Sequence, residues 1–296
     1  MGHGNYIALF DVLGFEERLE ALGLQEMLIR YEALIDTVNY RKHHTEHVFE
    51  KLGFSEEPYW TAEGDILIFT KTHGAYASDS ILLWANRTWP AVSQENEESF
   101  LSLASNATNG WKYHPIPCDN FLEVCNDLMC RGLEVGLPLR GAISIGEAVL
   151  DSSRSIFLGK PIIEAARLEA GQRLIGTSFC SSMVAQFIPQ RFKISFDNHI
   201  KENYHSLFGG AMLDWPRHWR NTRKSDLREA ISKLNTNEKY SEYYKNTLEM
   251  ISFSETFADQ FESLQEKSIR TQYDQFSWSN SELSVSCRAI RRVSVS

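Results

Sequence analysis

The chain has 296 residues, of which 43% are hydrophobic, enough to bury one large core or a core with a smaller extension. Its formal net charge of -9 argues against a nucleic-acid partner, because phosphate binding needs a basic stripe. No apolar run approaches the about 18 residues of a membrane span, and the N-terminus lacks the apolar region of a signal peptide. Five cysteines without a CxxC pair argue against disulfides and zinc. We therefore expect a cytoplasmic protein with no membrane partner.

The first half of the chain contains a long predicted helix and a short one near residues 97–105, among predicted strands. Residues 5–10 form a short apolar run that is typical of a buried strand. Apolar side chains then recur at helical spacing over 24–38, which predicts a long helix. After a polar stretch, residues 59–71 and 75–86 are predicted strands, and residues 86–118 are a polar, loop-rich insertion.

The second half alternates between predicted helices and strands. Pro161 suits the first turn of one helix, and Thr177 is a plausible cap for another. The whole order is βαββαβ with additions, which predicts an α+β fold of ferredoxin-like type, with an antiparallel sheet and helices on one of its faces. The predicted elements are a helix over 120–136, a strand pair or bent strand over 137–151, a helix over 158–170, a strand over 172–176 and a helix over 177–188.

The segment FDVLGF, residues 10–15, places a carboxylate at the end of the first predicted strand. Asp11 is therefore expected at the rim of the sheet. The turn that follows it into a helix directs free backbone N–H groups to a place where a triphosphate can bind. Magnesium bound to a nucleotide takes one or two protein carboxylates and completes its shell with phosphate and water oxygens. The alternative interpretation is that Asp11 only caps the following helix, and this short motif alone does not decide between the two.

A second carboxylate on a neighbouring strand is what two-metal catalysis requires. Asp65 and Asp79 are both candidates, because each adjoins an apolar run of a predicted hairpin. Asp79 has a serine on both sides and a strand-like ILLW run after it, whereas Asp65 lies in a Glu-Gly-Asp turn, for which a structural role suffices. We favour Asp79 as the metal ligand and keep Asp65 as its rival.

Four segments of the chain resemble class III nucleotidyl cyclases in residue type and in order. More narrowly, they resemble the bacterial pyrimidine cyclases of the Pycsar antiphage systems. On this resemblance, residues 1–187 are a catalytic core, and residues 188–296 are an α/β extension of the same domain. The four segments are IALFDVLGF, ASDSILLW, LPLRGAISIGEAV and FLGKPIIEAARLE, all within residues 5–185.

The resemblance implies a head-to-tail homodimer with active sites at the interface. Each site would hold two Mg²⁺ or Mn²⁺ ions and convert a nucleoside triphosphate to a 3′,5′-cyclic monophosphate and pyrophosphate. The implied metal-binding residues are Asp11, Val12 and Asp79. One ion lowers the pKa of the ribose 3′-hydroxyl and the other holds the triphosphate. The implied substrate contacts of the first turn are Phe10, Val12, Leu13, Gly14 and Phe15.

Two arginines are further candidates for the site. Arg167 matches the arginine that these enzymes place near the transition-state phosphate, as a catalytic residue. Where they carry an asparagine four residues earlier, this chain has Ile163, so no residue is assigned to orient the ribose. Alternatively, Arg167 is a surface charge paired with Glu164 or Glu169. Arg140 lies in a predicted strand, where a charge needs a partner, so it either contacts a phosphate or base or belongs to an ion pair.

The chain lacks the lysine with which related enzymes recognise adenine, and this absence bears on its base selectivity. Adenylate cyclases of this class read adenine with a lysine four residues before the second metal-binding aspartate. The matching position is Ala75, or Thr61 if Asp65 is the ligand, so cAMP is not expected. Tyr76, or Tyr59 in the alternative register, is a candidate for narrowing the pocket around a pyrimidine.

We expect UTP to be preferred over CTP as the substrate. The product, cUMP or cCMP, would then be a second messenger in antiphage defence that a separate cyclic-nucleotide-binding effector reads. A purine cyclase and an inactive nucleotide-binding module are the alternative functions.

Overall fold

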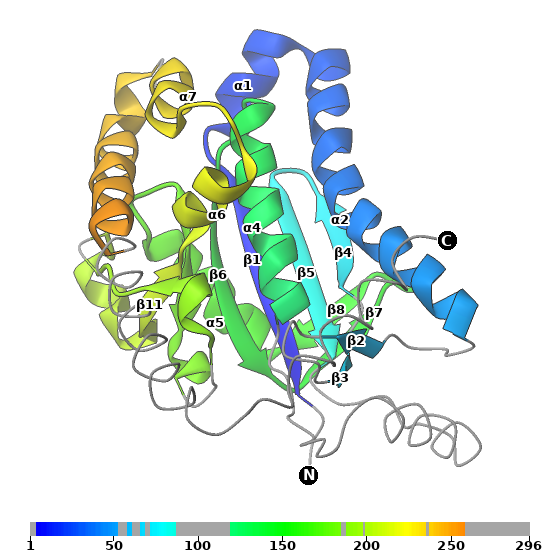
Figure 1. The fold of residues 1–296 in the computed structure, drawn as a ribbon. Coiled ribbons are helices and arrows are strands. Elements are labelled where there is room, and N and C mark those ends of the chain that lie inside the picture. Colours follow the sequence, from blue (N-terminus) through cyan, green and yellow to red (C-terminus); the bar gives the residue numbers. More distant parts are fainter. Residues whose placement is uncertain are drawn as a thin grey trace, which may run out of the picture. The chain divides into compact units, whose positions relative to one another are not determined.

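The computed structural model describes most of the N-terminal and central parts of the chain (Figure 1). Its contacts divide the chain into two compact units, Met1–Ser252 and Phe253–Ser296, and all the elements discussed below belong to the first. Residues 87–118 of the predicted insertion lie outside the described part. The described residues are 4–52, 58–60, 66–68, 72–86, 119–184, 188–197, 199–234 and 237–257.

A seven-stranded sheet forms the centre of the first unit, in the order β10-β11-β9-β6-β1-β5-β4. β1 is the middle strand of the core and pairs antiparallel with both β5 and β6. The strands β4, β5 and β6 follow β1 along the chain with helices between them in the predicted βαββαβ order, so the α+β fold is confirmed. The strands are β1 (Asn5–Val12), β4 (His73–Ala77), β5 (Ser80–Asn86), β6 (Leu139–Gly146), β9 (Gly176–Cys180), β10 (Lys193–Ile194) and β11 (Phe208–Leu213).

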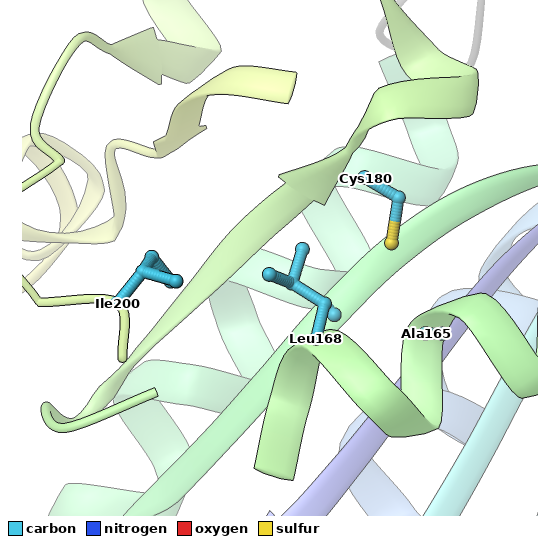
Figure 2. Close-up of a cluster of buried hydrophobic side chains, with 5 residues drawn as sticks. Ala165, Leu168, Cys180 and Ile200 are labelled. Atoms are coloured by element: carbon cyan, nitrogen blue, oxygen red, sulfur yellow. The ribbon is translucent and has the colours of Figure 1, made fainter. Parts of the chain in front are cut away.

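Helices cover both faces of this sheet, although only one face was expected to be covered. On one face, Tyr6 of β1 stacks on Phe121 of α4 (Asp119–Glu134), beside α2 (Leu24–Leu52). On the other face, Leu9 of β1 packs against a cluster that includes residues of α5 (Lys160–Gly171) (Figures 1 and 2). The expectation was wrong because successive apolar residues of a strand point to opposite faces, and β1 is apolar on both. The buried cluster under α5 is Ala142, Ala165, Leu168, Cys180 and Ile200.

Residues 176–180 form a strand, where a helix starting at Thr177 was predicted. This strand, β9, is buried along its whole length and runs parallel to β6. Among the described residues between this strand and Ile188, Ser181–Met183 are helical, as a single 3₁₀ turn. Pairing with β6 and β11 on either side outweighs the local preference of the sequence, as is usual for a central strand.

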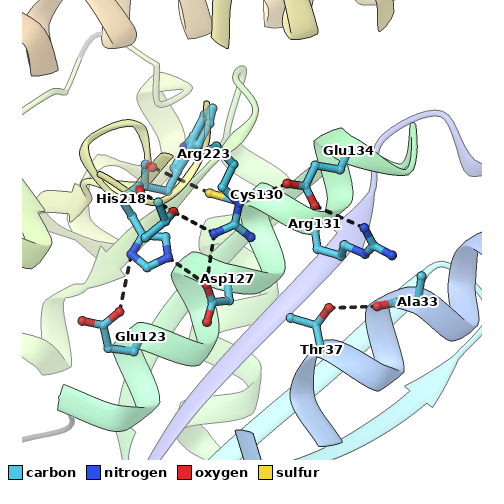
Figure 3. A network of polar contacts seen from close by, with 11 residues as sticks. Ala33, Thr37, Glu123, Asp127, Cys130, Arg131, Glu134, His218 and Arg223 are labelled. Carbon is cyan, nitrogen blue, oxygen red and sulfur yellow. Dashed lines mark hydrogen bonds and ion pairs between the residues drawn. The ribbon is translucent and has the colours of Figure 1, made fainter. Parts of the chain in front are cut away.

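The C-terminal extension joins the core through α6 (Trp215–Thr222), which packs on α4. Asp214 caps α6 by accepting a hydrogen bond from the backbone N–H of Arg217. A network of charged groups then ties α6 to α4 (Figure 3): His218 Nε2 lies 2.7 Å from Asp127, and Arg223 contacts both Asp127 at 3.4 Å and Glu134 at 3.0 Å. Residues 188–252 therefore share one compact unit with the core sheet and its helices.

Shorter elements complete the first unit. Within the predicted strand over 59–71, the structure describes two short strands, which pair with each other. Among the described residues, no helix is long and apolar enough to cross a membrane. The remaining elements are α1 (Phe15–Leu22), β2 (Pro58–Trp60), β3 (Ile66–Ile68), β7 (Ala148–Asp151), β8 (Ile156–Gly159), α7 (Leu227–Leu234), the 3₁₀ turns Gln190–Phe192, Glu202–Leu207 and Glu238–Tyr240, and helical residues 241–252.

A buried histidine predicts how acid affects the stability of this fold. His199 is 1% exposed and contacts Ser178 Oγ at 2.8 Å, and burial lowers its pKa to about 3. Because the unfolded chain takes up this proton below pH 6.5 and the folded chain does not, stability falls as the pH drops from 6.5 towards 3. We expect His199 to contribute a loss of about 2 kcal/mol between pH 7.5 and pH 5.

The test is urea unfolding of the wild type and of His199→Asn at both pH values. The contributions of other titrating groups to the stability loss are the same in both proteins and cancel in the comparison. The variant should therefore lose less stability on acidification than the wild type. Equal losses in the two proteins would show that His199 titrates normally in the fold.

Candidate active site

Asp11 lies near the end of β1 on the face of the sheet that α5 covers. Its backbone is paired with Arg140 of β6 on one side and with Ser80 of β5 on the other, so all three side chains share this face. Asp11 is not the cap of the following helix: the N-cap of α1 is Gly14, in a left-handed conformation with φ 72°, and no side chain caps it. The carboxylate of Asp11 is therefore available for another role at the sheet rim.

Asp79 lies in the tight turn between β4 and β5, next to Asp11. Its backbone carbonyl accepts a hydrogen bond of 2.9 Å from Val12 N–H, which ties the turn to the end of β1. Ser78, before it, adopts φ 55° to make this turn. Burial raises the pKa of Asp11 above its ordinary value and, although Arg140 opposes this rise, the neighbouring Asp79 carboxylate adds to it. The hairpin thus brings together two carboxylates that are far apart in the sequence.

The rival carboxylate, Asp65, lies outside the described residues, as does Thr61. Tyr59 is in β2, a strand that pairs with β3 and not with the main sheet. The choice of Asp79 over Asp65 therefore rests on the observed proximity of Asp79 to Asp11.

A third carboxylate, Glu169 of α5, belongs to this group and was not predicted as a site residue. Its Oε1 lies 2.6 Å from Arg140 Nε, the same nitrogen that donates a hydrogen bond of 3.1 Å to Asp11 Oδ2. Burial raises the pKa of Glu169 to about 7; Arg140 opposes this, and Asp11 and Asp79 add to it. The signal in the sequence was the charge of Arg140 in a buried strand, which requires a partner, but its partner could not be chosen from the sequence.

The turn from β1 into α1 provides backbone donors beside the carboxylates. Phe10, Val12 and Leu13 are buried, and Leu13 N–H donates to Pro138 O at 2.9 Å. The N–H groups of the first turn of α1, starting at Phe15, have no acceptor within the helix itself. They are the groups with which this turn can bind an anion.

Residues of the C-terminal extension pack against this turn. Tyr240 lies over Gly14, where an added Cβ would come within 3.1 Å of its ring, and its hydroxyl donates to Glu17 at 2.9 Å. Tyr243 Oη accepts a hydrogen bond of 3.4 Å from Arg140 Nη1. The extension is therefore part of the site's surroundings.

Two predicted residues lie away from the paired carboxylates. Tyr76 pairs with Ile81, whose backbone is opposite Phe10, so its side chain points to the face covered by α2. Arg167 is on the exposed side of α5, close to Ile163, which is 53% exposed. Glu164 accepts hydrogen bonds from Ser181 Oγ and Ser182 N–H. The suggested pairing of Arg167 with Glu169 is replaced by the Arg140–Glu169 ion pair.

Comparison with solved structures shows a similarity, whereas two other comparisons show none. No protein-family model matches the sequence, and none of the curated proteins is similar to it. Among solved structures, the chain is similar to the catalytic core of a rhodopsin-guanylyl cyclase with converted specificity, crystallised in complex with ATPalphaS. The sequence identity is 11% and the TM-score is 0.36, and the match covers 71% of this chain and 92% of that one.

Proposed function

We propose that the protein is a pyrimidine nucleotide cyclase that converts UTP to 3′,5′-cyclic UMP and pyrophosphate. The observation that carries this proposal is the pair of carboxylates, Asp11 and Asp79, held together at the sheet rim beside the N-terminus of α1. An acidic pair next to free backbone N–H groups suits a divalent cation together with a triphosphate. CTP is the alternative substrate, with cCMP as the product.

The donor set fits Mg²⁺ or Mn²⁺ that arrives with a nucleotide. Such an ion needs only one or two protein carboxylates, which Asp11 and Asp79 provide, with Val12 adjoining them. In the described part of the chain, no group of three acidic, histidine or cysteine side chains has the geometry to hold a metal alone. We propose two ions per site, which when bound acidify the ribose 3′-hydroxyl and neutralise charge on the leaving pyrophosphate.

The remaining residues bind and orient the substrate in this proposal. The turn from Phe10 to Phe15 holds the triphosphate through backbone N–H groups of Gly14 and Phe15. Before a cation binds, Arg140 holds Asp11 in place through its Nε–H. Base selectivity is not assigned to Tyr76, which points to the other face of the sheet.

A head-to-tail homodimer with shared active sites is part of the proposal. Arg167 lies on the exposed side of α5 and does not face Asp11 of its own chain, so it suits contact with the transition-state phosphate in a partner's site. Apolar side chains close by in the chain are exposed: Val149 and Leu158 are cross-strand neighbours in the β7–β8 hairpin, and Ile163 is in α5. A second subunit would cover them. We further propose that a separate effector reads the cyclic product as an antiphage signal.

The decisive experiment incubates the purified dimer with each of the four ribonucleoside triphosphates and Mn²⁺. We expect cyclic UMP and pyrophosphate from UTP, less or no product from CTP, and none from ATP or GTP. Chromatography with mass spectrometry identifies the product. A cyclic purine product would replace the pyrimidine assignment, and nucleotide binding without any product would identify an inactive binding module.

A further inference from the structure

Arg140 is shared between two carboxylates through a single nitrogen atom. Its Nε donates to Asp11 Oδ2 at 3.1 Å and lies 2.6 Å from Glu169 Oε1. Among the described residues, Oε1 of Glu169 receives no hydrogen bond of acceptable geometry, although the charges are in contact. The Nε–H of Arg140 thus points to Asp11, while Glu169 lies in contact with the same nitrogen without accepting its hydrogen bond.

The charges around Arg140 do not balance. Glu169 is 7% exposed, and the side chains of Asp11 and Arg140 are only about one-fifth exposed, so water screens these charges weakly. Arg140 faces two carboxylates, Asp11 and Glu169, and a third, Asp79, lies close to both of them. Lys201 adds one further positive charge near Glu169, so the carboxylates still outnumber the cations. An added cation at Asp11 and Asp79 would balance the excess, but it competes directly with Arg140 for Asp11.

The surroundings of Arg140 leave Glu169 as the alternative partner. Tyr243 contacts the far end of the guanidinium, with its hydroxyl 3.4 Å from Nη1 and its ring centroid 5.8 Å from Cζ. Both carboxylate oxygens already lie within contact distance of Nε, so a rotation of the Arg140 side chain can redirect its N–H from Asp11 to Glu169. The displaced arginine would then keep an ion pair and remain neutralised.

We propose that Glu169 is a positioning residue that takes Arg140 over from Asp11 when a divalent cation binds, so that Asp11 becomes free to ligate the cation. This inference rests on the proposed metal-dependent function of Asp11 and Asp79. Glu169 itself touches neither the cation nor the nucleotide. Without Glu169, Arg140 has Asp11 as its only described carboxylate partner. A cation that binds Asp11 must then leave the guanidinium of Arg140 without an ion pair.

The test is binding of Mn²⁺ alone, measured from the electron paramagnetic resonance signal of the free ion. Glu169→Gln should bind Mn²⁺ about 10- to 100-fold more weakly than the wild type, the usual range for groups that support metal ligands. Glu164→Gln removes a carboxylate from the same helix that does not contact Arg140, and it should bind as the wild type does. Thermal unfolding verifies that each variant is folded.

Two further variants test whether Arg140 is transferred from Asp11 to Glu169, which we call the handover, or whether Glu169→Gln weakens Mn²⁺ binding only by removing a negative charge. Glu169→Asp keeps the charge but shortens the side chain, so weaker binding is expected if Glu169 must reach Arg140. Adding Arg140→Gln should then strengthen Mn²⁺ binding by a larger factor in the Glu169→Gln background than in the wild type. This double variant has no buried unpaired arginine and so serves if Glu169→Gln alone fails to fold.

The outcomes distinguish this inference from the proposed function. Equal Mn²⁺ affinities of the wild type and Glu169→Gln, or strictly additive effects of the two substitutions, would overturn the handover. A wild type that does not bind Mn²⁺ would overturn it as well. A wild type that binds Mn²⁺ through this network but forms no cyclic product from any nucleotide would remove the proposed cyclase activity and leave the handover standing.

Discussion

Replacing Asp79 by asparagine should reduce cyclic nucleotide formation by about a thousandfold, because a metal ion contributes several kcal/mol to stabilising transition-state charge and each 1.36 kcal/mol is a factor of ten. The asparagine keeps the shape of the side chain, and the backbone hydrogen bond from Val12 N–H to the carbonyl of residue 79 does not depend on the side chain. The fold should therefore be retained. Product formation from UTP with Mn²⁺ is the measurement, with thermal unfolding in parallel.

Asp65→Asn is the matched comparison, because it removes the rival carboxylate by the same chemical change. We expect it to cyclise UTP at close to the wild-type rate, and Asp11→Asn to be as inactive as Asp79→Asn. If instead Asp65→Asn is inactive and Asp79→Asn is normal, the second metal ligand is Asp65. Asp79 then has only a structural role beside Asp11.

The second large effect concerns the joining of the C-terminal extension to the core. Trp215 begins α6, is 0% exposed, and its carbonyl lies 3.9 Å from Cys130 Sγ of α4. Truncating a fully buried tryptophan leaves a large cavity, so Trp215→Ala should lower the free energy of unfolding by about 3–5 kcal/mol. Urea unfolding followed by far-ultraviolet circular dichroism measures this loss.

Trp215→Phe is the control for the size of that cavity. Among the described residues, the indole N–H of Trp215 has no hydrogen-bond acceptor, so phenylalanine removes no observed hydrogen bond and leaves a smaller void. Trp215→Phe should lower the free energy of unfolding clearly less than Trp215→Ala does. A loss below about 1 kcal/mol for Trp215→Ala would mean that α6 does not support the core as its burial indicates, because such losses are typical of surface substitutions.

The order of most core elements and the positions of two carboxylates at strand ends could be predicted from local patterns. An apolar run that ends in Asp11, and a second run that begins after Asp79, place each carboxylate at a strand end without reference to the rest of the chain. The strand at 176–180 could not be predicted from local patterns. Its residues around Phe179 are compatible with either a helix or a strand, and only the pairing with β6 and β11 selects the strand.

The partner of Arg140 illustrates the same limit within the site. An arginine in a buried strand shows that an opposite charge must be near, but the sequence does not identify the carboxylate that supplies it. Helix α5 packs on the Asp11 side of the sheet and turns Glu169 inward and Arg167 outward. Their roles follow from the rotation of the helix about its axis, which the apolar residues Ala165 and Leu168 set by packing on the sheet.

Sequence alone thus decided the α+β class, the βαββαβ order and the position of Asp11 at the rim, because strand and helix periods and strand ends are local properties. Tertiary structure decided which carboxylates meet. The proximity of Asp79 to Asp11 and the sharing of Arg140 with Glu169 depend on the pairing of β1 with β5 and β6 and on the face that α5 covers. Such long-range pairing is set by burial of the whole core, which no single segment encodes.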